Sequence, residues 1–425
     1  MNRRTFCKQS IWAVSGASMM PSLISSIREI PQRRTYPLHE LKKPLAIAMW
    51  DYSWILRHHR YGEFENWDLV LEGLAERGYN AIRIDAMPQY VAADTDGHIQ
   101  DQFRSVKKDW VPIKWGNDYS MDFRPREALL EFLPKCKKYG IKVGLATWFM
   151  AQGGPRGIFK EKGGLYRAWN ETLAFLKQNH LLDEQIIYVD LLNEYPFWHG
   201  YDWLKEELNA RGNINQFKID NPNANIPDDI DTTKQRKFNP LQQAFYNDFI
   251  NETIRLLQLS YPEYPFHFSL DGGMKLDSID LSRFGALDYH LWFASAGKLP
   301  FLNELGNIDQ SKDNRMIYRD FLAAWNEKKT ELIHWMDNNI SEISTVAKKY
   351  QIPCGNTEGW GAIFWLDHPD TDWRFIKESA EICIDLAKKH DNYKFICTSN
   401  FTHPQFKGIW EDIQWHRKLT SRIQE

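Results

Sequence analysis

The stretch "IIYVDLLNEYPFWHG", residues 186–200, begins as an apolar run and ends in polar and aromatic side chains. Six of its first seven residues are apolar, the exception being Asp190. A continuous apolar run of this length is typical of a parallel strand that is buried on both faces. Asn193 and Glu194 follow the run directly and lead into a cluster of aromatic rings. We therefore expect a buried strand whose carboxyl end carries functional side chains.

Similar apolar runs recur along the chain and alternate with segments of helical periodicity. The eight expected strands cover residues 44–50, 79–86, 141–149, 185–193, 265–270, 286–293, 351–358 and 393–400. Two amphipathic segments end at Gly78 and Gly140, directly before the next strand, and glycine is a common C-cap of helices. Eight strands alternating with helices predict a (β/α)8 TIM barrel. A doubly wound open sheet is the alternative, but no G-x-G-x-x-G motif follows any strand.

Two insertions lengthen the expected barrel. Residues 201–240 are polar and rich in Asn, Asp and Pro, so we expect a long loop after strand 4. Residues 294–350, after strand 6, are expected to hold a further loop and a helix. Loops that follow barrel strands lie at the C-terminal face, so both insertions are expected to wall a cleft there. We expect residues 40–425 to form a single catalytic domain.

The first 26 residues have the composition of an export signal. Arg3 and Arg4 precede "IWAVSGASMMPSLISS", residues 11–26, which is uncharged and rich in small residues. This stretch is too short and too polar to span a bilayer permanently. The paired arginines resemble a twin-arginine signal, with a Sec-type signal as the alternative. We expect the mature protein to be exported, to the periplasm or the extracellular space.

Composition narrows the classes of partner. The formal net charge of −3 over 425 residues gives no indication of a nucleic-acid partner, which would favour a basic patch. The 18 tryptophans predict either a ring-filled core or flat faces for ligand stacking. The cysteines outside the export segment, Cys136, Cys354, Cys383 and Cys397, show no CxxC spacing. A zinc site is therefore not expected, and buried free thiols are favoured over a Cys354–Cys397 disulfide.

Two glutamates are expected at the carboxyl ends of strands, where the reactive groups of a barrel stand. Glu194 follows the fourth strand and Glu358 follows the seventh, so they lie on opposed parts of the ring and can face each other. Facing carboxyl groups suit glycoside hydrolysis, in which one protonates the leaving oxygen and the other attacks or activates water. Arg83, on the second strand, would keep one of them anionic.

These strand ends resemble clan A glycoside hydrolases, the retaining barrel enzymes that include family 5 cellulases and mannanases. "NAIRI", residues 80–84, is similar to the strand-2 motif of that clan, whose arginine supports the nucleophile. The resemblance implies that Glu194 is the acid/base and Glu358 the nucleophile of a double displacement on β-linked glycans. It also implies that Asn193 binds the sugar 2-hydroxyl and that His290 is the strand-6 histidine. Strict alternation would point Asn193 away from its neighbour, so the strand must end irregularly.

The chain departs from family 5 at several strand ends. Trp148 stands where family 5 commonly has histidine, and Trp292 replaces the tyrosine expected two residues after the strand-6 histidine. Tyr289 is the candidate to supply that missing hydroxyl. We expect Trp148, Trp292 and Trp360 to bind substrate as flat platforms for a sugar ring, with Trp365 as a further candidate. The alternative for each tryptophan is a place in the core.

Two other functions are compatible with the sequence. A non-catalytic carbohydrate-binding barrel would keep the tryptophans but would need neither glutamate, so the two carboxyl groups and Arg83 favour the enzyme. An inverting hydrolase would hold its carboxyl groups about 6.5–9.5 Å apart, against about 5–5.5 Å for a retaining one. The expected partner is a carbohydrate substrate, with no nucleic acid, no stable membrane span and no cofactor. The sequence does not predict the sugar, the linkage or the oligomeric state.

Overall fold

The structure is a computed structural model. It describes residues 36–105, 117, 120–212, 238–293, 315–362, 367 and 371–425. The expected export segment and Trp365 lie outside these residues. Residues Thr35–Glu425 form one compact unit. No helix among the described residues is both long enough and apolar enough to cross a membrane.

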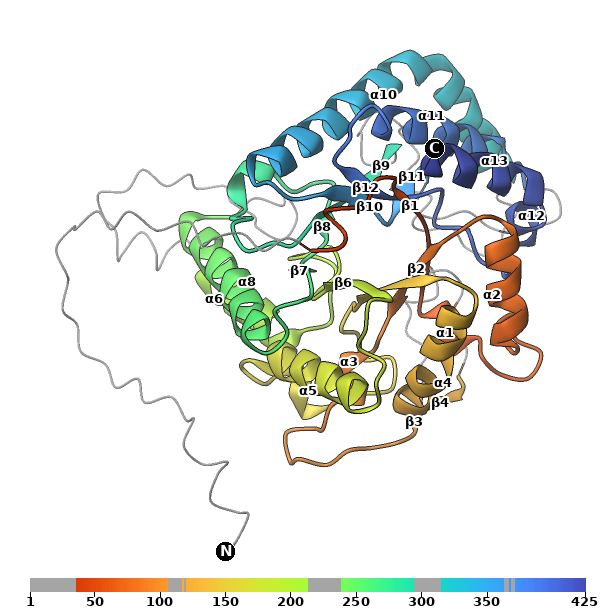
Figure 1. The fold of residues 1–425 in the computed structure, drawn as a ribbon. Helices are drawn as coiled ribbons and strands as arrows, with labels where there is room; N and C mark the ends of the chain where they lie inside the picture. The colour runs from red at the N-terminus through yellow and green to blue at the C-terminus, as the bar shows by residue number, and fades with distance from the viewer. Residues whose placement is uncertain are drawn as a thin grey trace, which may run out of the picture. The chain divides into compact units, whose positions relative to one another are not determined.

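Parallel strands surround a central axis and are enclosed by helices (Figure 1). The strands are β1 (Leu45–Asp51), β2 (Ala81–Asp85), β5 (Lys142–Ala146), β6 (Ile186–Asp190), β7 (Phe266–His267), β8 (Leu270–Asp271), β9 (Leu287–Trp292), β10 (Cys354–Asn356), β11 (Gly359–Trp360) and β12 (Tyr393–Cys397). Strand β12 pairs with β1, with Leu45 opposite Phe395. Strands β7 and β8 are two halves of one strand, of which β7 pairs with β6 and β8 pairs with β9. The remaining parallel pairings run in the orders β1–β2–β5–β6 and β9–β10–β12, and together they close the predicted (β/α)8 barrel.

Helices pack around the strands. The longer ones are α2 (Trp67–Glu76), α4 (Pro125–Lys138), α5 (Gly164–Gln178), α8 (Pro240–Ser260), α10 (Arg315–Lys349), α11 (Arg374–Ala387) and α13 (Ile413–Gln424). The shorter elements are α1 (Ser53–Leu56), α3 (Pro88–Val91), α12 (Lys407–Trp410), the 3-10 turns η1 (Gly157–Phe159) and η2 (Leu276–Ser278), and the antiparallel pair β3 (Phe103–Arg104) and β4 (Asp122–Phe123). Gly78 and Gly140 adopt φ values of 81° and 70° after α2 and α4, as expected of helix C-caps.

The described part of the long loop expected at 201–240 is partly helical. Residues Asp202–Arg211 form helix α6, which buries Leu204 and Leu208 on one side. The segment "DWLKEELNAR" is made mostly of good helix formers, and its two leucines are one turn apart. The Asn- and Pro-rich composition that predicted a loop belongs to residues 213–237, which lie outside the described residues. The helix expected within 294–350 is confirmed as α10.

Strand boundaries also differ at the two glutamates. Strand 4 was expected to run to residue 193, but β6 ends at Asp190. Strand 7 was expected as one run, but it is divided into β10 and β11, with Glu358 in the break between them.

The four cysteines of the compact unit are all free and buried, which excludes the alternative disulfide.

Candidate active site

The backbone after β6 leaves the sheet, and this positions Asn193 and Glu194. The Asn193 amide donates to the carbonyl of Thr147 at 2.8 Å. Glu194 then adopts a left-handed φ of 45°, and its amide donates to Ser269 Oγ at 3.0 Å. This turn breaks strict strand alternation. Asn193 and Glu194 can therefore serve one site, as the sequence required.

Glu358 and Glu194 meet around His290. The amide of Glu358 donates to the side chain of Asn356 at 3.0 Å, and the Glu358 side chain is almost wholly buried. Glu194 Oε1 lies 3.0 Å from His290 Nδ1, and Glu358 Oε1 lies 3.6 Å from the same nitrogen. One polar atom from each of these three residues lies within 4.8 Å of the others. The two glutamates therefore approach each other closely.

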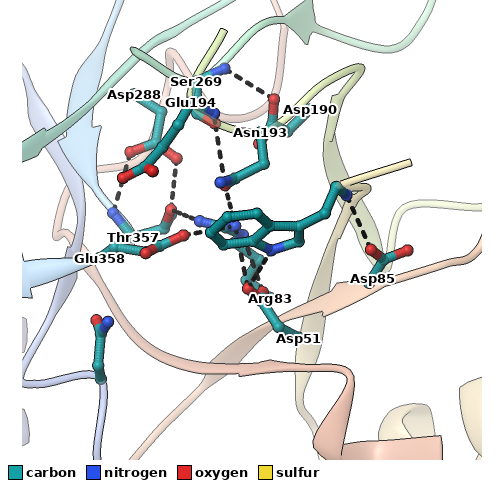
Figure 2. Close-up of polar contacts among 12 residues, drawn as sticks. Asp51, Arg83, Asp85, Asp190, Asn193, Glu194, Ser269, Asp288, Thr357 and Glu358 are labelled. Atoms are coloured by element: carbon teal, nitrogen blue, oxygen red, sulfur yellow. Dashed lines mark hydrogen bonds and ion pairs between the residues drawn. The ribbon is translucent and has the colours of Figure 1, made fainter. Parts of the chain in front are cut away.

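Arg83 is the hub of the cluster, and Figure 2 shows it between Asp51 and Glu358. Its guanidinium lies 2.8 Å from Glu358 Oε1 and 3.2 Å from Asp51 Oδ1. It also donates to Thr357 Oγ1 at 2.8 Å and to Asn193 Oδ1. Arg83 is fully buried, so these partners replace the water that would otherwise solvate its charge, and removing one of them would leave a buried charge uncompensated.

His290 is held by an aspartate on its own strand. Asp288 and His290 are two residues apart on β9, so both side chains point into the barrel. His290 Nε2 lies 3.7 Å from Asp288 Oδ2, and that carboxylate also accepts the amide of Thr357 at 3.0 Å. Burial alone would lower the pKa of His290, but Glu358 and Asp288 raise it well above its ordinary value. His290 therefore presents Nδ1 to the two glutamates, while Nε2 faces Arg83 Nη1 at 3.2 Å.

Burial has the largest effect on Glu358. It raises the pKa of this carboxyl to about 8, although His290 and Arg83 favour the ionised form. The neighbouring Glu194 carboxyl adds to the rise, because two negative charges at this separation repel each other. Glu358 therefore ionises at a higher pH than an ordinary glutamate, in concert with its neighbours.

Trp148, two residues after the end of β5, contacts the cluster from the side of Asp51. Its backbone amide donates to Asp85 Oδ2 at 2.8 Å, and its indole nitrogen donates to Asp51 Oδ2 at 2.6 Å. Asp51 in turn binds Arg83, so Trp148 reaches the nucleophile region through two contacts. The structure thus places Trp148 beside the predicted site.

The other expected aromatic residues differ in position. Trp292 follows His290 by two residues on β9 and lies on the same face of the strand. Tyr289 points to the opposite face, where its hydroxyl donates to the carbonyl of Met274 at 2.5 Å, away from the two glutamates. Trp360 is 1% exposed and donates to the carbonyl of Cys397, so it fills the core and offers no open ring face.

Three site residues went unrecognised in the sequence. Asp288, Thr357 and Ser269 carry the second layer of contacts, which hold His290, Arg83 and the Glu194 backbone respectively. Strand alternation from the strand-6 histidine could have identified Asp288 as inward-facing. The hydroxyls of Thr357 and Ser269 carry no comparable signal, because no motif in the sequence distinguishes them from other serines and threonines.

Two groups of residues in the described structure have the spacing of metal ligands. Glu194, His290 and Glu358 form one, but Arg83 already occupies Glu358 at 2.8 Å, so a further cation does not fit there. The second group is Asp190, His267 and Asp288, deeper in the barrel. Within it, both ring nitrogens of His267 and Asp190 Oδ2 are buried without a partner. Buried polar atoms of this kind are commonly satisfied by an ordered water molecule.

A barrel with paired glutamates at the ends of its strands carries the two carboxyl groups that glycoside hydrolysis uses. The chain belongs to the sugar-binding cellulase-like family: the sequence model of that family matches residues 47–424. It is a glycoside hydrolase.

Solved structures share the fold. A protein from Parabacteroides distasonis ATCC 8503, assigned provisionally to the glycoside hydrolases, is 28% identical, with a TM-score of 0.72, and covers 91% of this chain and 94% of its own. The cellulose synthase subunit Z of Clostridioides difficile is 10% identical, with a TM-score of 0.50, and covers 90% of this chain and 100% of its own. The second likeness concerns the fold alone. None of the curated proteins matches the sequence.

Proposed function

We propose that the protein hydrolyses β-linked glycans with retention of configuration, with Glu358 as nucleophile and Glu194 as acid/base. One observation carries the proposal: the two glutamates meet around His290, with one polar atom of each of the three residues within 4.8 Å of the others. Inverting enzymes need about 6.5–9.5 Å to admit a water molecule between the carboxyl groups. The β-linkage rests on the cellulase-like family and on the clan A pattern of the strand ends.

In the first step, the Glu358 carboxylate attacks the anomeric carbon. The bond from that carbon to the leaving oxygen breaks, and Glu194 gives its proton to this oxygen. Arg83 and His290 both approach Oε1 of Glu358, at 2.8 and 3.6 Å, which leaves Oε2 to form the new bond. The products are an alcohol and a glycosyl ester of Glu358.

In the second step, water attacks the anomeric carbon of the ester. Glu194, now a carboxylate, takes the proton of the water, and the bond to Glu358 breaks. The sugar leaves with its original configuration, and both glutamates return to their starting states. The single group Glu194 thus acts as acid and then as base.

Asn193 is suited to bind the sugar. Its Oδ1 accepts hydrogen bonds from Arg83 and from Ser269 Oγ, which fixes the orientation of the amide. Its Nδ2 is buried and has no partner among the described residues. A sugar hydroxyl would satisfy this donor, and leaving it unsatisfied is costly.

Reaction with azide distinguishes the nucleophile Glu358 from the acid/base Glu194. The substrate is a dinitrophenyl β-glycoside, because its leaving group departs without a proton. In Glu194→Ala the glycosyl ester should accumulate, and azide should convert it to a glycosyl azide of retained configuration. In Glu358→Ala azide should attack the substrate directly and give the inverted azide. The reverse pattern would show that the two roles are exchanged. Sugar binding without turnover by the unmutated protein would support the non-catalytic alternative.

A further inference from the structure

An asparagine beyond the last strand contacts the backbone of the proposed nucleophile. Asn400 lies three residues after the end of β12. Its Oδ1 accepts a hydrogen bond from the Gly359 amide at 3.1 Å. This amide belongs to the peptide bond that joins Glu358 to Gly359, so the Asn400 side chain lies directly beside the nucleophile.

The contact with Gly359 fixes the orientation of the Asn400 amide. A backbone N–H can only donate, so the side-chain atom that faces it is the oxygen, and Nδ2 is the other branch of the amide. Asn400 Nδ2 is buried and has no partner among the described residues. A buried donor without an acceptor is costly, and such groups are normally paired with protein, water or a ligand. Asn400 therefore holds an oriented donor that is available to an acceptor from outside the chain.

A second asparagine supports the nucleophile from the outer side of the sheet. Asn356 Oδ1 accepts the Glu358 amide at 3.0 Å. The next residue, Thr357, bonds to Arg83 inside the barrel, so strand alternation directs Asn356 outward. A Cβ added to Gly359 would lie 2.7 Å from Asn356 Nδ2, so this amide is packed against the backbone. Asn356 shares the structural contact of Asn400 but points away from the interior of the barrel, which makes it the matched control.

Strand order places Asn400 across the barrel from Asn193. Strand β12 lies between β10 and β1, whereas Asn193 follows β6, on the opposed part of the ring. The Glu358 carboxylate must contact the anomeric carbon of the attacked sugar, so an amide beside it lies next to the same ring. We propose that Asn400 Nδ2 donates a hydrogen bond to a hydroxyl of the attacked sugar, other than the one that Asn193 binds. The inference rests on the proposed function.

Such a bond makes Asn400 a residue that determines specificity. A site that hydrogen-bonds a substrate hydroxyl rejects the analogue that lacks it, because the buried donor is then left unpaired. A purely structural Asn400 would instead support every substrate equally, through its contact with Gly359. The two roles therefore predict different responses to the loss of a single sugar hydroxyl.

Deoxy sugars test this directly. The probes are the β-glucosyl, β-mannosyl or β-galactosyl fluoride that the unmutated protein hydrolyses best, and the 3-deoxy, 4-deoxy and 6-deoxy forms of that fluoride. Asn400→Ala should lower kcat/KM for the parent fluoride on the order of tenfold or more, and for one of the deoxy fluorides by a factor about tenfold smaller. The intrinsic reactivity of each deoxy sugar cancels in this comparison, because it is the same for both proteins.

Asn356→Ala removes the same kind of backbone contact and should lower kcat/KM for all four fluorides by one common factor. Asn400→Ser, whose hydroxyl is too short to reach the sugar, should give the pattern of Asn400→Ala and serves if that variant does not fold. A common factor on all four fluorides for the Asn400 variants, or no loss on any, would overturn the bond to the sugar while leaving the hydrolase intact. No turnover of any fluoride by the unmutated protein would instead overturn the proposed function, and the role of Asn400 with it.

Discussion

Glu358 stands between groups that pull its ionisation in opposite directions. Burial and the nearby Glu194 favour the protonated carboxyl, whereas Arg83 at 2.8 Å and His290 favour the carboxylate. The balance leaves the pKa of Glu358 at about 8, above the ordinary glutamate range. A nucleophile must be ionised to attack, so this balance determines where activity begins as the pH rises.

The pH dependence of activity follows from the raised pKa of Glu358. As the pH falls, Glu358 gains a proton and activity is lost, so we expect the acidic limb of kcat/KM at a higher pH than an ordinary glutamate, about 4.3, would give. With a glycosyl fluoride, which needs no acid, Glu194→Gln should move this limb to lower pH because it removes a repelling charge. A limb that stays at the same pH in this variant would contradict the coupling of the two glutamates.

Arg83 should not tolerate lysine. Lysine keeps the charge but cannot bind Glu358, Asp51 and Thr357 at once through a planar fork. We expect Arg83→Lys to lower kcat/KM on the order of a hundredfold or more while the fold persists, measured with a glycosyl fluoride and circular dichroism. Arg124→Lys, at an exposed arginine, is the control and should change neither.

At the scale of elements, the apolar runs located every barrel strand but not the geometry of its end. Strand β6 lies within the predicted 185–193, yet the left-handed Glu194 that follows it depends on contacts with Ser269, which is distant in sequence. Alternation along β9 does predict which side chains face the site. It separates His290 from Tyr289, which are neighbours on one strand and therefore face opposite ways.

Helix α8 offers a test of how an element is secured. The side chain of Asn239 accepts a hydrogen bond from the Gln242 amide at 2.9 Å, and the Gln242 side chain accepts one from the Asn239 amide, which together form a capping box. Asn239 also donates to the carbonyl of Arg211 at the end of α6. We expect Asn239→Ala to lower the free energy of unfolding by about 1–2 kcal/mol, measured by denaturant titration, with activity unchanged.

Asn66→Ala, which removes the cap of α2, is the matched comparison. Asn66 caps its helix without a capping box, so its loss should be smaller. A larger effect at Asn66 than at Asn239 would contradict the additional role assigned to the α6 contact.

For the whole molecule, buried neutral histidines link stability to pH. His416 accepts from Tyr79 on Nδ1 and contacts the carbonyl of Ile409 on Nε2, and His199 accepts the amide of Tyr201. In each of these two histidines one ring nitrogen accepts a hydrogen bond, so that nitrogen carries no proton and the ring is neutral. Burial lowers the pKa of each from 6.5 to about 3.

Both lowered pKa values therefore predict that the free energy of unfolding falls as the solution becomes more acidic. Below pH 6.5 the unfolded chain binds protons that the folded protein excludes, so each histidine should cost on the order of 2 kcal/mol of unfolding free energy between pH 6.5 and about 4.5. His416→Gln should flatten the fall of Tm with acidification, since the amide keeps a donor and loses the titration. An unchanged slope in this variant would contradict the assignment.

Export also belongs to the whole molecule, and we propose it from the basic residues Arg3 and Arg4 before an uncharged stretch. The mature protein should begin after roughly residue 20–30, as N-terminal sequencing of protein from the native cell would show. Retention of Met1 on that protein would contradict export by a cleaved signal.

The covalent intermediate tests the central claim most directly. In a 2-deoxy-2-fluoro-β-glycosyl fluoride, the fluorine on carbon 2 slows both steps, because both pass through transition states with positive charge on the sugar. The fluoride leaving group speeds attachment alone, so the glycosyl ester accumulates. Incubation of the unmutated enzyme with the gluco, manno and galacto forms should add one fluorosugar, found by peptide mass spectrometry on Glu358. A fluorosugar on Glu194, or inverted sugar released from a natural β-glycan with no labelled protein, would contradict the assignment of Glu358 as the nucleophile of a retaining hydrolase.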